Sequence, residues 1–385
     1  MVFTKQVISS VLITFSSFIS FSQDNFDKEK DINALMNECL VDKGKKPVHN
    51  FLLYAENAET EFQINTGVGE VKRKSRYVNE TYQFNIASIT KTLVATIILQ
   101  MEEEGKLKIE DKAEKYLGTL EFIDFKNLHI LNKTSYSDDI DIKMLLNHTS
   151  GIADVFIDKA IRFNLSVLLN PKKQYTAKKF FEKYYKYGLN KKPHNAPGKG
   201  YYYSDINYML LGFIIEELSG ETLAQVIRKR ILEPLQMQNT YFEFYEPIKG
   251  NGKRIDAFLN RINITKKVNT SYEWAGGGLV STTEDMANFV KALFKLRLFK
   301  HKQALNKMID CSDTEKFNKN YGLGIFKYEI KGITFYGHGG FYGSFLAYAP
   351  KEGLLISANV NQANPPFNSM EVISKLVSIL HKNQI

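Results

Sequence analysis

Cysteine is scarce in this sequence: Cys39 and Cys311 are the only two among 385 residues. Two cysteines exclude a small fold stapled by several disulfide bonds, and the 7 histidines show no metal-ligand spacing with them. Whether Cys39 and Cys311 pair is left open, because their distance in sequence does not say whether they meet. We therefore expect no metal centre.

Internal repeats and low-complexity linkers are absent too, and proline is infrequent, with 9 copies. The composition is 44% hydrophobic and 24% charged, which is ordinary for a soluble globular protein. These values exclude a disordered chain, a collagen and a membrane protein with several spans. The length allows two or three domains or one large composite domain.

No arginine-rich block accompanies the formal net charge of +9. The lysines are scattered among acidic residues, whereas a nucleic-acid-binding surface needs a clustered basic stripe with aromatic platforms. We interpret the charge as a solvated basic surface and expect no nucleic-acid partner. Polyanionic material of the cell envelope is the alternative partner.

The N-terminal 22 residues differ from the rest of the chain. Lys5 is their only charged residue, and an apolar, serine-rich run over residues 7–22 ends in the small residues Ser20 and Ser22. This layout predicts a signal peptide over residues 1–22, because the run is too short for a membrane span of about 20 apolar residues. An uncleaved anchor is the alternative. We expect the mature chain, 23–385, to be exported to the periplasm or the extracellular space.

Apolar periodicity predicts strands near both ends of the chain and helices between them. Helices are expected over residues 88–104, over 208–218 with a stop at Gly220, and over 372–381. We predict an α+β fold with one antiparallel sheet flanked by helices. It draws on residues of about 45–105 and 275–385, and an all-helical region of about 106–274 is inserted between them. The strands are expected at 51–54, 61–65, 321–330, 333–336, 344–349 and 354–359.

A serine and a lysine three residues apart form the first candidate for chemistry. Ser88 stands where a loop becomes a helix, and a helix N-terminus stabilises developing negative charge. Lys91 lies on the same helical face, where its amine can act as a base or as a fixed positive charge beside the hydroxyl. Alone the pair is a weak signal, since a helix-capping serine and a solvated lysine look the same.

Two further segments carry polar groups at places where a chain turns. Tyr203-Ser204-Asp205 joins a Pro/Gly-rich loop to an apolar helix, and a lysine nearby would favour the Tyr203 phenolate as a proton acceptor. In residues 336–343, four glycines around His338 bring a backbone close to a neighbour, so an N–H group there could stabilise an oxyanion. A core tyrosine and a plain β-turn are the alternatives.

In this order, the three segments and their flanks resemble the serine β-lactamase and penicillin-binding DD-peptidase superfamily, in the class C-like branch that includes esterases and D-amino-acid peptidases. The resemblance runs from about residue 84 to residue 361. Its flanks also include residues 145–152, 203–212 and 275–282. It implies an antiparallel sheet with helices, an all-helical region and an active site between them.

The resemblance also implies roles for individual residues. Ser88 would be the acylated nucleophile, Lys91 its cationic partner and Tyr203 the general base of acylation. The oxyanion hole would consist of the backbone N–H groups of Ser88 and Phe341. No metal or organic cofactor is expected, and the residues 148–151 and 276–278 are interpreted as structural.

The third motif would line the substrate site. It is formed by His338, Gly339 and Gly340.

Two departures from the β-lactamase pattern shift the expected substrate. Asp205 stands where Asn is usual, and a carboxylate only accepts hydrogen bonds, so it would pair with Lys91 or bind a donor on the substrate. His338 stands where Lys is common, so the permanent cation for a substrate carboxylate is missing. If protonated His338 holds that carboxylate, activity on such substrates falls as pH rises past its pKa.

We therefore expect a serine hydrolase that acts through an acyl-enzyme on ester or amide substrates, either a D-Ala-type peptidase or an esterase. The alternatives are a β-lactamase, an acyltransferase that shares the acyl-enzyme, and a non-catalytic envelope-binding protein. The expected partner is a small molecule or a peptide, including cell-wall peptides, and the chain is expected to be a monomer.

Overall fold

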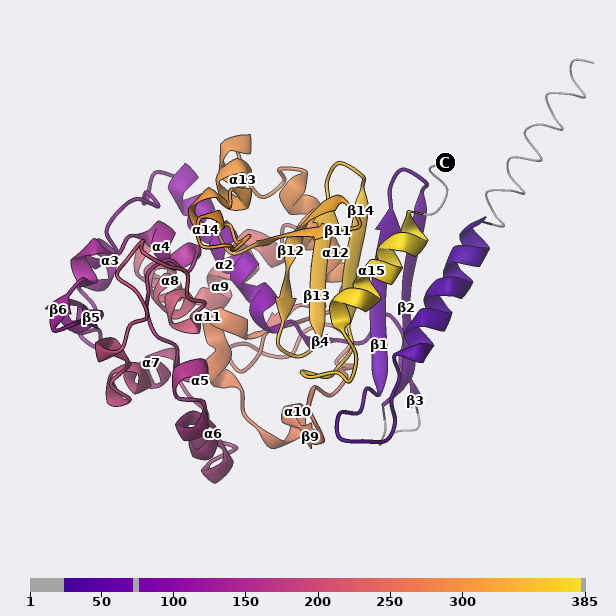
Figure 1. Ribbon diagram of the computed structural model, residues 1–385, viewed down its shortest axis with the longest axis horizontal. Helices are drawn as coiled ribbons and strands as arrows, with labels where there is room; N and C mark the ends of the chain where they lie inside the picture. Colours follow the sequence, from indigo (N-terminus) through magenta and orange to yellow (C-terminus); the bar gives the residue numbers. More distant parts are fainter. Residues whose placement is uncertain (1–23, 72–75, 382–385) are drawn as a thin grey trace, which may run out of the picture.

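The structure, a computed structural model, describes residues 24–71 and 76–381 (Figure 1). The predicted signal peptide, residues 1–22, lies outside the described residues. Within the described ranges, no helix is long and apolar enough to cross a membrane. Cys39 and Cys311 are buried free thiols, so they do not pair.

A seven-stranded sheet is formed by strands from both ends of the chain, and each strand is antiparallel to its neighbours. This confirms the predicted sheet. Ser344–Ala349 and Leu354–Asn359 have the predicted bounds, while Tyr321 makes only an isolated bridge to Phe326 and lies outside the strand predicted for it. In spatial order the strands are β11 (Phe326–Ile330), β12 (Ile333–Gly340), β13 (Ser344–Ala349), β14 (Leu354–Asn359), β1 (Asn50–Asn57), β2 (Phe62–Val71) and β3 (Arg76–Tyr77).

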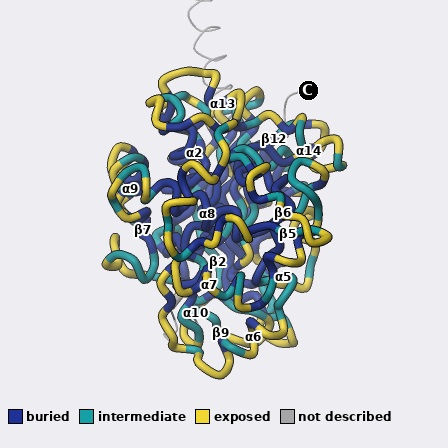
Figure 2. Tube along the Cα trace, turned by 90° about the vertical axis from the view of Figure 1, so that its left-hand side faces the viewer, coloured by how far each residue is buried: buried dark blue, intermediate teal, exposed yellow. Residues whose placement is uncertain are grey.

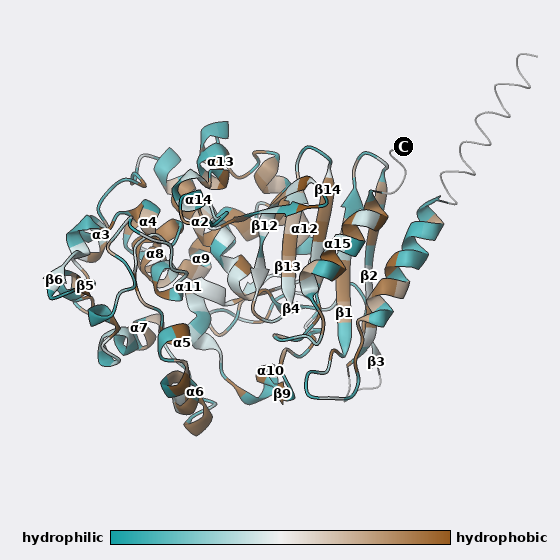
Figure 3. Cartoon of the chain, viewed as in Figure 1, coloured by the Kyte–Doolittle hydropathy of each residue, from teal (hydrophilic) through white to brown (hydrophobic). Residues whose placement is uncertain are grey.

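Helices cover both faces of the sheet, because its central strands are apolar on both sides (Figure 3). In β1, Phe51 and Leu53 pack towards α15 (Ser369–Leu380) and the helix over residues 24–38. Leu52 and Tyr54 face the other way, into the larger core. The period-two alternation of a strand therefore divides the apolar residues between two layers.

The larger core lies between the sheet and the inserted helices. Figure 2 shows buried chain gathered around α8, with exposed chain at the rim. The central helices of this core are α2 (Thr90–Glu103) and α8 (Asp205–Ser219), which contact each other and are buried over most of their length. As predicted, Gly220 ends α8; it adopts the left-handed conformation that glycine tolerates best. The other helices of eight or more residues are α6 (Ala160–Leu169), α7 (Ala177–Lys186), α12 (Thr283–Phe294) and α13 (Lys302–Ile309).

Short elements join these layers around the start of α2. The 3-10 turn η1 (Ala87–Ile89) precedes α2, so the helix predicted to begin at residue 88 begins as a tighter turn. A three-stranded sheet packs beside η1 and consists of β4 (Phe84–Asn85), β10 (Leu279–Ser281) and β7 (Tyr241–Phe242). The short helices that bear on the site are α4 (Ile142–Leu146), α5 (Val155–Asp158), α10 (Ile264–Lys267) and α11 (Trp274–Gly277).

We expect the contact between α15 and the sheet to be a main source of stability. Leu376 on α15 is fully buried, so Leu376→Ala should lower the free energy of unfolding by about 2–5 kcal/mol. Met370 lies on the same helix and is 40% exposed, so Met370→Ala should change it by less than about 1 kcal/mol. Urea denaturation measures both, and equal losses would contradict this assignment of the core.

Candidate active site

Ser88 occupies the one accessible position in a buried stretch of chain. Residues 82–87 and 89–99 are all buried, whereas Ser88 is half-buried. Ala87, just before it, has a φ of 46°, a left-handed conformation that is unfavourable for a residue with a Cβ. The strained turn therefore presents the Ser88 hydroxyl outward while its neighbours stay in the core.

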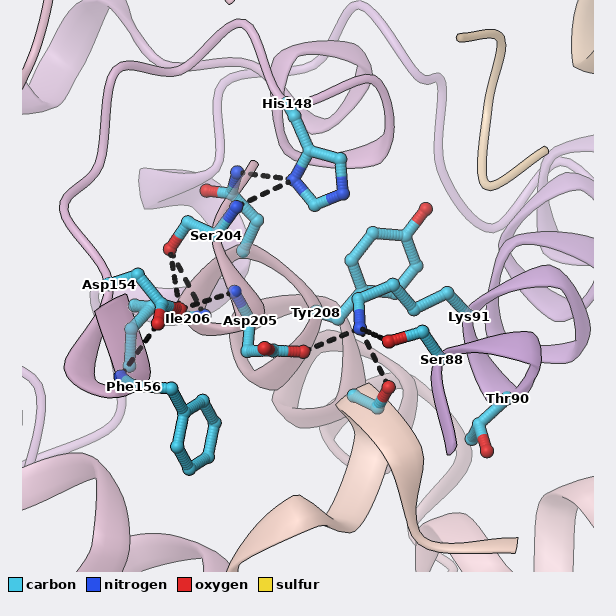
Figure 4. Close-up of polar contacts among 12 residues, drawn as sticks. Ser88, Thr90, Lys91, His148, Asp154, Phe156, Ser204, Asp205, Ile206 and Tyr208 are labelled. Carbon is cyan, nitrogen blue, oxygen red and sulfur yellow. Dashed lines mark hydrogen bonds and ion pairs between the residues drawn. The ribbon is translucent and has the colours of Figure 1, made fainter. Parts of the chain in front are cut away.

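The ammonium group of Lys91 lies directly beside this hydroxyl (Figure 4). Lys91 is fully buried, and its Nζ donates to Ser88 Oγ at 3.1 Å, to Asp205 Oδ1 at 2.5 Å and to the Gly276 carbonyl oxygen at 2.7 Å. An ammonium group has three donors, and here each has an acceptor. The structure therefore brings Ser88 and Lys91 together, and Asp205 pairs with Lys91, the first of the two contacts expected for it. The catalytic roles of Ser88 and Lys91 stay predictions.

Asp205 is held in place by the way α8 begins. The Ser204 side chain caps the helix by accepting from the Ile206 N–H, and the Asp205 N–H donates to Asp154 Oδ2 at 2.7 Å. Asp154 is itself buried and caps α5 through the N–H groups of Phe156 and Ile157. Burial and the nearby Asp205 carboxylate raise the pKa of Asp154 to about 7.

The Tyr203 side chain lies against Lys91, but as a neutral phenol. Lys91 Nζ is 5.0 Å from the centre of the Tyr203 ring. Burial and, second to it, the Asp205 carboxylate raise the pKa of Tyr203 well above its ordinary value. The expectation that Lys91 favours the phenolate is therefore wrong for this structure. In the described part of the chain, the buried Tyr203 hydroxyl has no hydrogen-bond partner.

His148 contacts the segment that carries Tyr203 through both a hydrogen bond and its ring. Its Nδ1 accepts from the Ser204 backbone N–H at 3.2 Å, and Asn207 Nδ2 lies 3.1 Å from the same atom. Its ring also packs on the Tyr203 ring with centroids 4.2 Å apart. Burial holds the pKa of His148 well below its usual range, so His148 acts as a neutral support, in keeping with its structural interpretation from sequence.

The end of β12 lies against the turn that carries Ser88. A Cβ on Gly340 would come within 2.2 Å of the Ile86 carbonyl oxygen, so only glycine fits there. That same oxygen accepts from Ser344 Oγ at 2.9 Å, and Phe341 between these residues is 57% exposed. The glycine-rich segment thus brings its backbone against Ile86, next to the η1 turn that carries Ser88. The oxyanion hole formed by the Ser88 and Phe341 N–H groups stays a prediction.

His338 does not have the side-chain position that the sequence suggested. It is 2% exposed, and its Nε2 and Nδ1 lie 3.1 Å from the Tyr321 hydroxyl and 2.7 Å from the Gly339 carbonyl oxygen. Burial and the Lys91 charge lower the pKa of His338 to about 3. His338 is therefore neutral near neutral pH and cannot hold a substrate carboxylate as a cation. The fall in activity with rising pH that the sequence analysis attached to protonated His338 is not expected near neutral pH.

Two groups in this region were missed from the sequence. The Gly276 carbonyl is an acceptor for Lys91, although the glycine run was interpreted as packing alone. Glu273 accepts from the Tyr342 hydroxyl, and burial raises its pKa to about 8. Neither has a sequence signal beyond proximity to glycines, because the contacts join residues far apart in the chain.

The arrangement has the parts needed for nucleophilic catalysis: an accessible hydroxyl, a buried cation beside it and a second proton-carrying group facing both. Across residues 24–71 and 76–381, no three His, Cys, Asp or Glu side chains are grouped to hold a metal ion. That the chain uses no cofactor stays a prediction. Fold and site together define an α+β protein whose candidate active site pairs a serine with a buried lysine.

The chain belongs to the Beta-lactamase family, whose model matches residues 39–374. It is 26% identical over 352 residues to Protein flp of Staphylococcus aureus, an alignment that covers 88% of this chain and 65% of that protein. The chain thus spans slightly less than two thirds of the length of that relative.

Two solved structures are similar to this one. A D-stereospecific amidohydrolase from Streptomyces sp. has a TM-score of 0.71 and 25% identity, over 88% of this chain and 97% of that one. A D-amino acid amidase from Ochrobactrum anthropi has a TM-score of 0.72 and 19% identity, over 92% of this chain and 98% of that one. The second likeness concerns the fold alone.

The Lys91–Asp205 pair offers a direct test of how the site is held. Asp205→Asn leaves a fully buried ammonium without its counter-charge, so unfolding free energy should fall by about 3 kcal/mol. Lys91→Met should be costly too, but the double variant should lose about 2 kcal/mol less than the sum of the two.

The exposed pair Lys229 and Glu221 is the matched control, with side chains 69% and 38% exposed. Its coupling should stay below about 1 kcal/mol. Chemical denaturation of both double-mutant cycles measures the difference, and equal couplings would show that the buried pair is not special.

Glu273 predicts a pH dependence of stability. Its pKa of about 8 exceeds the ordinary 4.5, so the folded state binds this proton more tightly than the unfolded state. The contribution of Glu273 to the free energy of unfolding is therefore fully present below about pH 4.5 and is lost as pH rises to about 8. Gln carries no such proton yet still accepts from Tyr342. The stability of Glu273→Gln relative to wild type should rise across this window, whereas exposed Glu182→Gln should stay level.

Proposed function

We propose that this chain is an exported serine hydrolase that cleaves amide or ester bonds of D-amino-acid-type substrates through an acyl-enzyme. The observation that carries the proposal is the contact of the accessible Ser88 hydroxyl with the buried Lys91 ammonium. The 25% identical amidohydrolase from Streptomyces, described as D-stereospecific, supports the substrate class. Export is inferred from residues 1–22 alone, and cell-wall peptides are the natural source of such substrates in an exported protein.

The proposed reaction begins when Ser88 Oγ attacks the substrate carbonyl carbon. The attack forms the C–O bond and moves the carbonyl electron pair onto oxygen, which gives a tetrahedral oxyanion. The neutral Tyr203 phenol relays the proton: its oxygen accepts the Ser88 proton as its own proton passes to the leaving nitrogen or oxygen, beside the Lys91 ammonium. Collapse of the oxyanion then breaks the bond to the amine or alcohol and leaves the acyl group on Ser88. N–H groups of Ser88 and Phe341 would hold the oxyanion. Water then attacks the carbonyl carbon of the Ser88 ester in the same way. The bond to Ser88 Oγ breaks, Ser88 regains its proton and the carboxylic acid is released.

The state of His338 favours amides and esters over β-lactams within this mechanism. A penicillin carries a carboxylate, and the third motif here supplies a buried, neutral imidazole in place of a cation. Losing a charged hydrogen bond of this kind weakens binding by about 1.5–3 kcal/mol. We therefore place β-lactam hydrolysis below D-amino-acid amide or ester hydrolysis.

Tyr203→Phe separates catalysis from stability. Its buried hydroxyl has no hydrogen-bond partner among the described residues, so removing it should cost less than about 1 kcal/mol of stability. If Tyr203 moves the Ser88 proton, kcat/KM for D-alanine p-nitroanilide should nevertheless fall by about 100- to 10,000-fold. Ser88→Ala should remove the activity, and the L-enantiomer is the stereochemical control.

A Tyr203→Phe variant with wild-type kcat/KM would contradict the proton-transfer role while leaving Ser88 in place. Equal rates on both enantiomers would contradict the substrate class. No turnover of any amide or activated ester by a folded wild-type chain would contradict the proposal as a whole and favour a binding protein.

A further inference from the structure

The helix α6 has two apolar faces, of which only one is covered. Phe163 and Val167 are buried in the core. Because successive residues turn by 100°, the other apolar residues of α6 lie on the opposite face. Those residues are exposed, at 88% for Ile161, 54% for Leu165, 68% for Leu168 and 71% for Leu169.

Ile157 in the preceding α5 adds to this surface and is 56% exposed. We call Ile157, Ile161, Leu165, Leu168 and Leu169 the α6 patch. It lies at the lower edge of the molecule in Figure 1, where α6 projects away from the sheet, and it is strongly hydrophobic in Figure 3. Single exposed apolar residues are common, but five in one short segment mark an interaction surface.

Basic residues outnumber acidic ones in the segment that contains the α6 patch. Residues 157–173 include four basic residues, Lys159, Arg162, Lys172 and Lys173, and one acidic residue, Asp158. Asp158 is engaged elsewhere, since its Oδ1 lies 2.9 Å from His194 Nε2 and accepts from Tyr202 at 3.0 Å.

The positive border extends to the neighbouring α10. Lys172 Nζ donates to the Lys266 carbonyl oxygen at 2.5 Å, which places α10, with its exposed Lys266 and Lys267, beside the segment that follows α6. Lys266 Nζ pairs with Asp256 at 2.6 Å, so Lys267 is the residue of α10 that adds positive charge to this border. An apolar strip with lysine and arginine along its edge is the composition of a helix that lies in the interface of a lipid bilayer.

We propose that the α6 patch docks onto an anionic phospholipid surface, with α6 parallel to the membrane plane and its basic border on the headgroups. Charge decides between this partner and a second copy of the chain. In a two-fold dimer through this patch the same basic residues would face one another and repel. An anionic bilayer instead complements them.

Docking would also place the catalytic site near the membrane. Asp158 at the end of α5 contacts Tyr202, the neighbour of Tyr203, and Asp154 at its start holds Asp205. The patch and the wall of the site are therefore parts of one packed unit. The inference does not rest on the proposed function, and Ser88→Ala should dock as the wild type does.

The test is hydrogen exchange of the full chain with and without vesicles of about 30% phosphatidylglycerol in phosphatidylcholine. A local readout is needed because residues 1–22 are themselves apolar. We expect amides in residues 157–173 to exchange at least about fivefold more slowly with anionic vesicles and unchanged with pure phosphatidylcholine.

Two double variants should lose this protection: Leu165→Ser with Leu168→Ser, and Lys172→Gln with Lys173→Gln. Ile248→Ser with Lys351→Gln, exposed residues outside the patch, is the control and should keep it. All these side chains are on the surface, so circular dichroism should show an unchanged fold.

Three results would overturn the proposal. They are unchanged exchange on anionic vesicles, equal protection on neutral and anionic vesicles, and protection that rises with protein concentration in the absence of lipid. The last of these would assign the patch to a second copy of the chain.

Discussion

The site depends on one buried positive charge, the ammonium of Lys91. A charge of this kind is costly to bury unless every donor is satisfied and a counter-charge is near. Lys91 meets both conditions through Ser88, Asp205 and the Gly276 carbonyl. Ser88, the proposed nucleophile, is therefore one of the three groups that make the buried charge tolerable, which couples its environment to the stability of the core.

The three acceptors come from different parts of the chain, so the fold must bring them together. The strained η1 turn carries Ser88, the capped start of α8 carries Asp205, and α11 carries Gly276. Asp154 fixes the start of α8 from a fourth segment, and β12 closes against the Ile86 carbonyl because Gly340 has no side chain. The sheet is formed by strands from both ends of the chain, and the helices are inserted between them. This architecture allows the three acceptors to meet at Lys91.

Local sequence patterns predicted the helices and strands more accurately than they predicted the charge states of the site residues. The bounds of β13 and β14 followed from alternation and glycine turns, whereas β12 extends through Gly340, since a glycine-rich strand end looks like a turn. Ser88, Lys91 and Asp205 could be placed together from motif order. The charge states of Tyr203 and His338 could not be predicted from the sequence, because they depend on burial by residues distant in sequence.

We propose that Ser88, activated beside Lys91, forms the acyl-enzyme. Intact-protein mass spectrometry after brief exposure to an activated D-alanine ester tests it most directly, with Ser88→Ala as the matched control. We expect one acyl group on the wild type, located by peptide mapping at Ser88, and none on the variant. An adduct of equal extent on both proteins, or none on a folded wild type that turns over the ester, would contradict it.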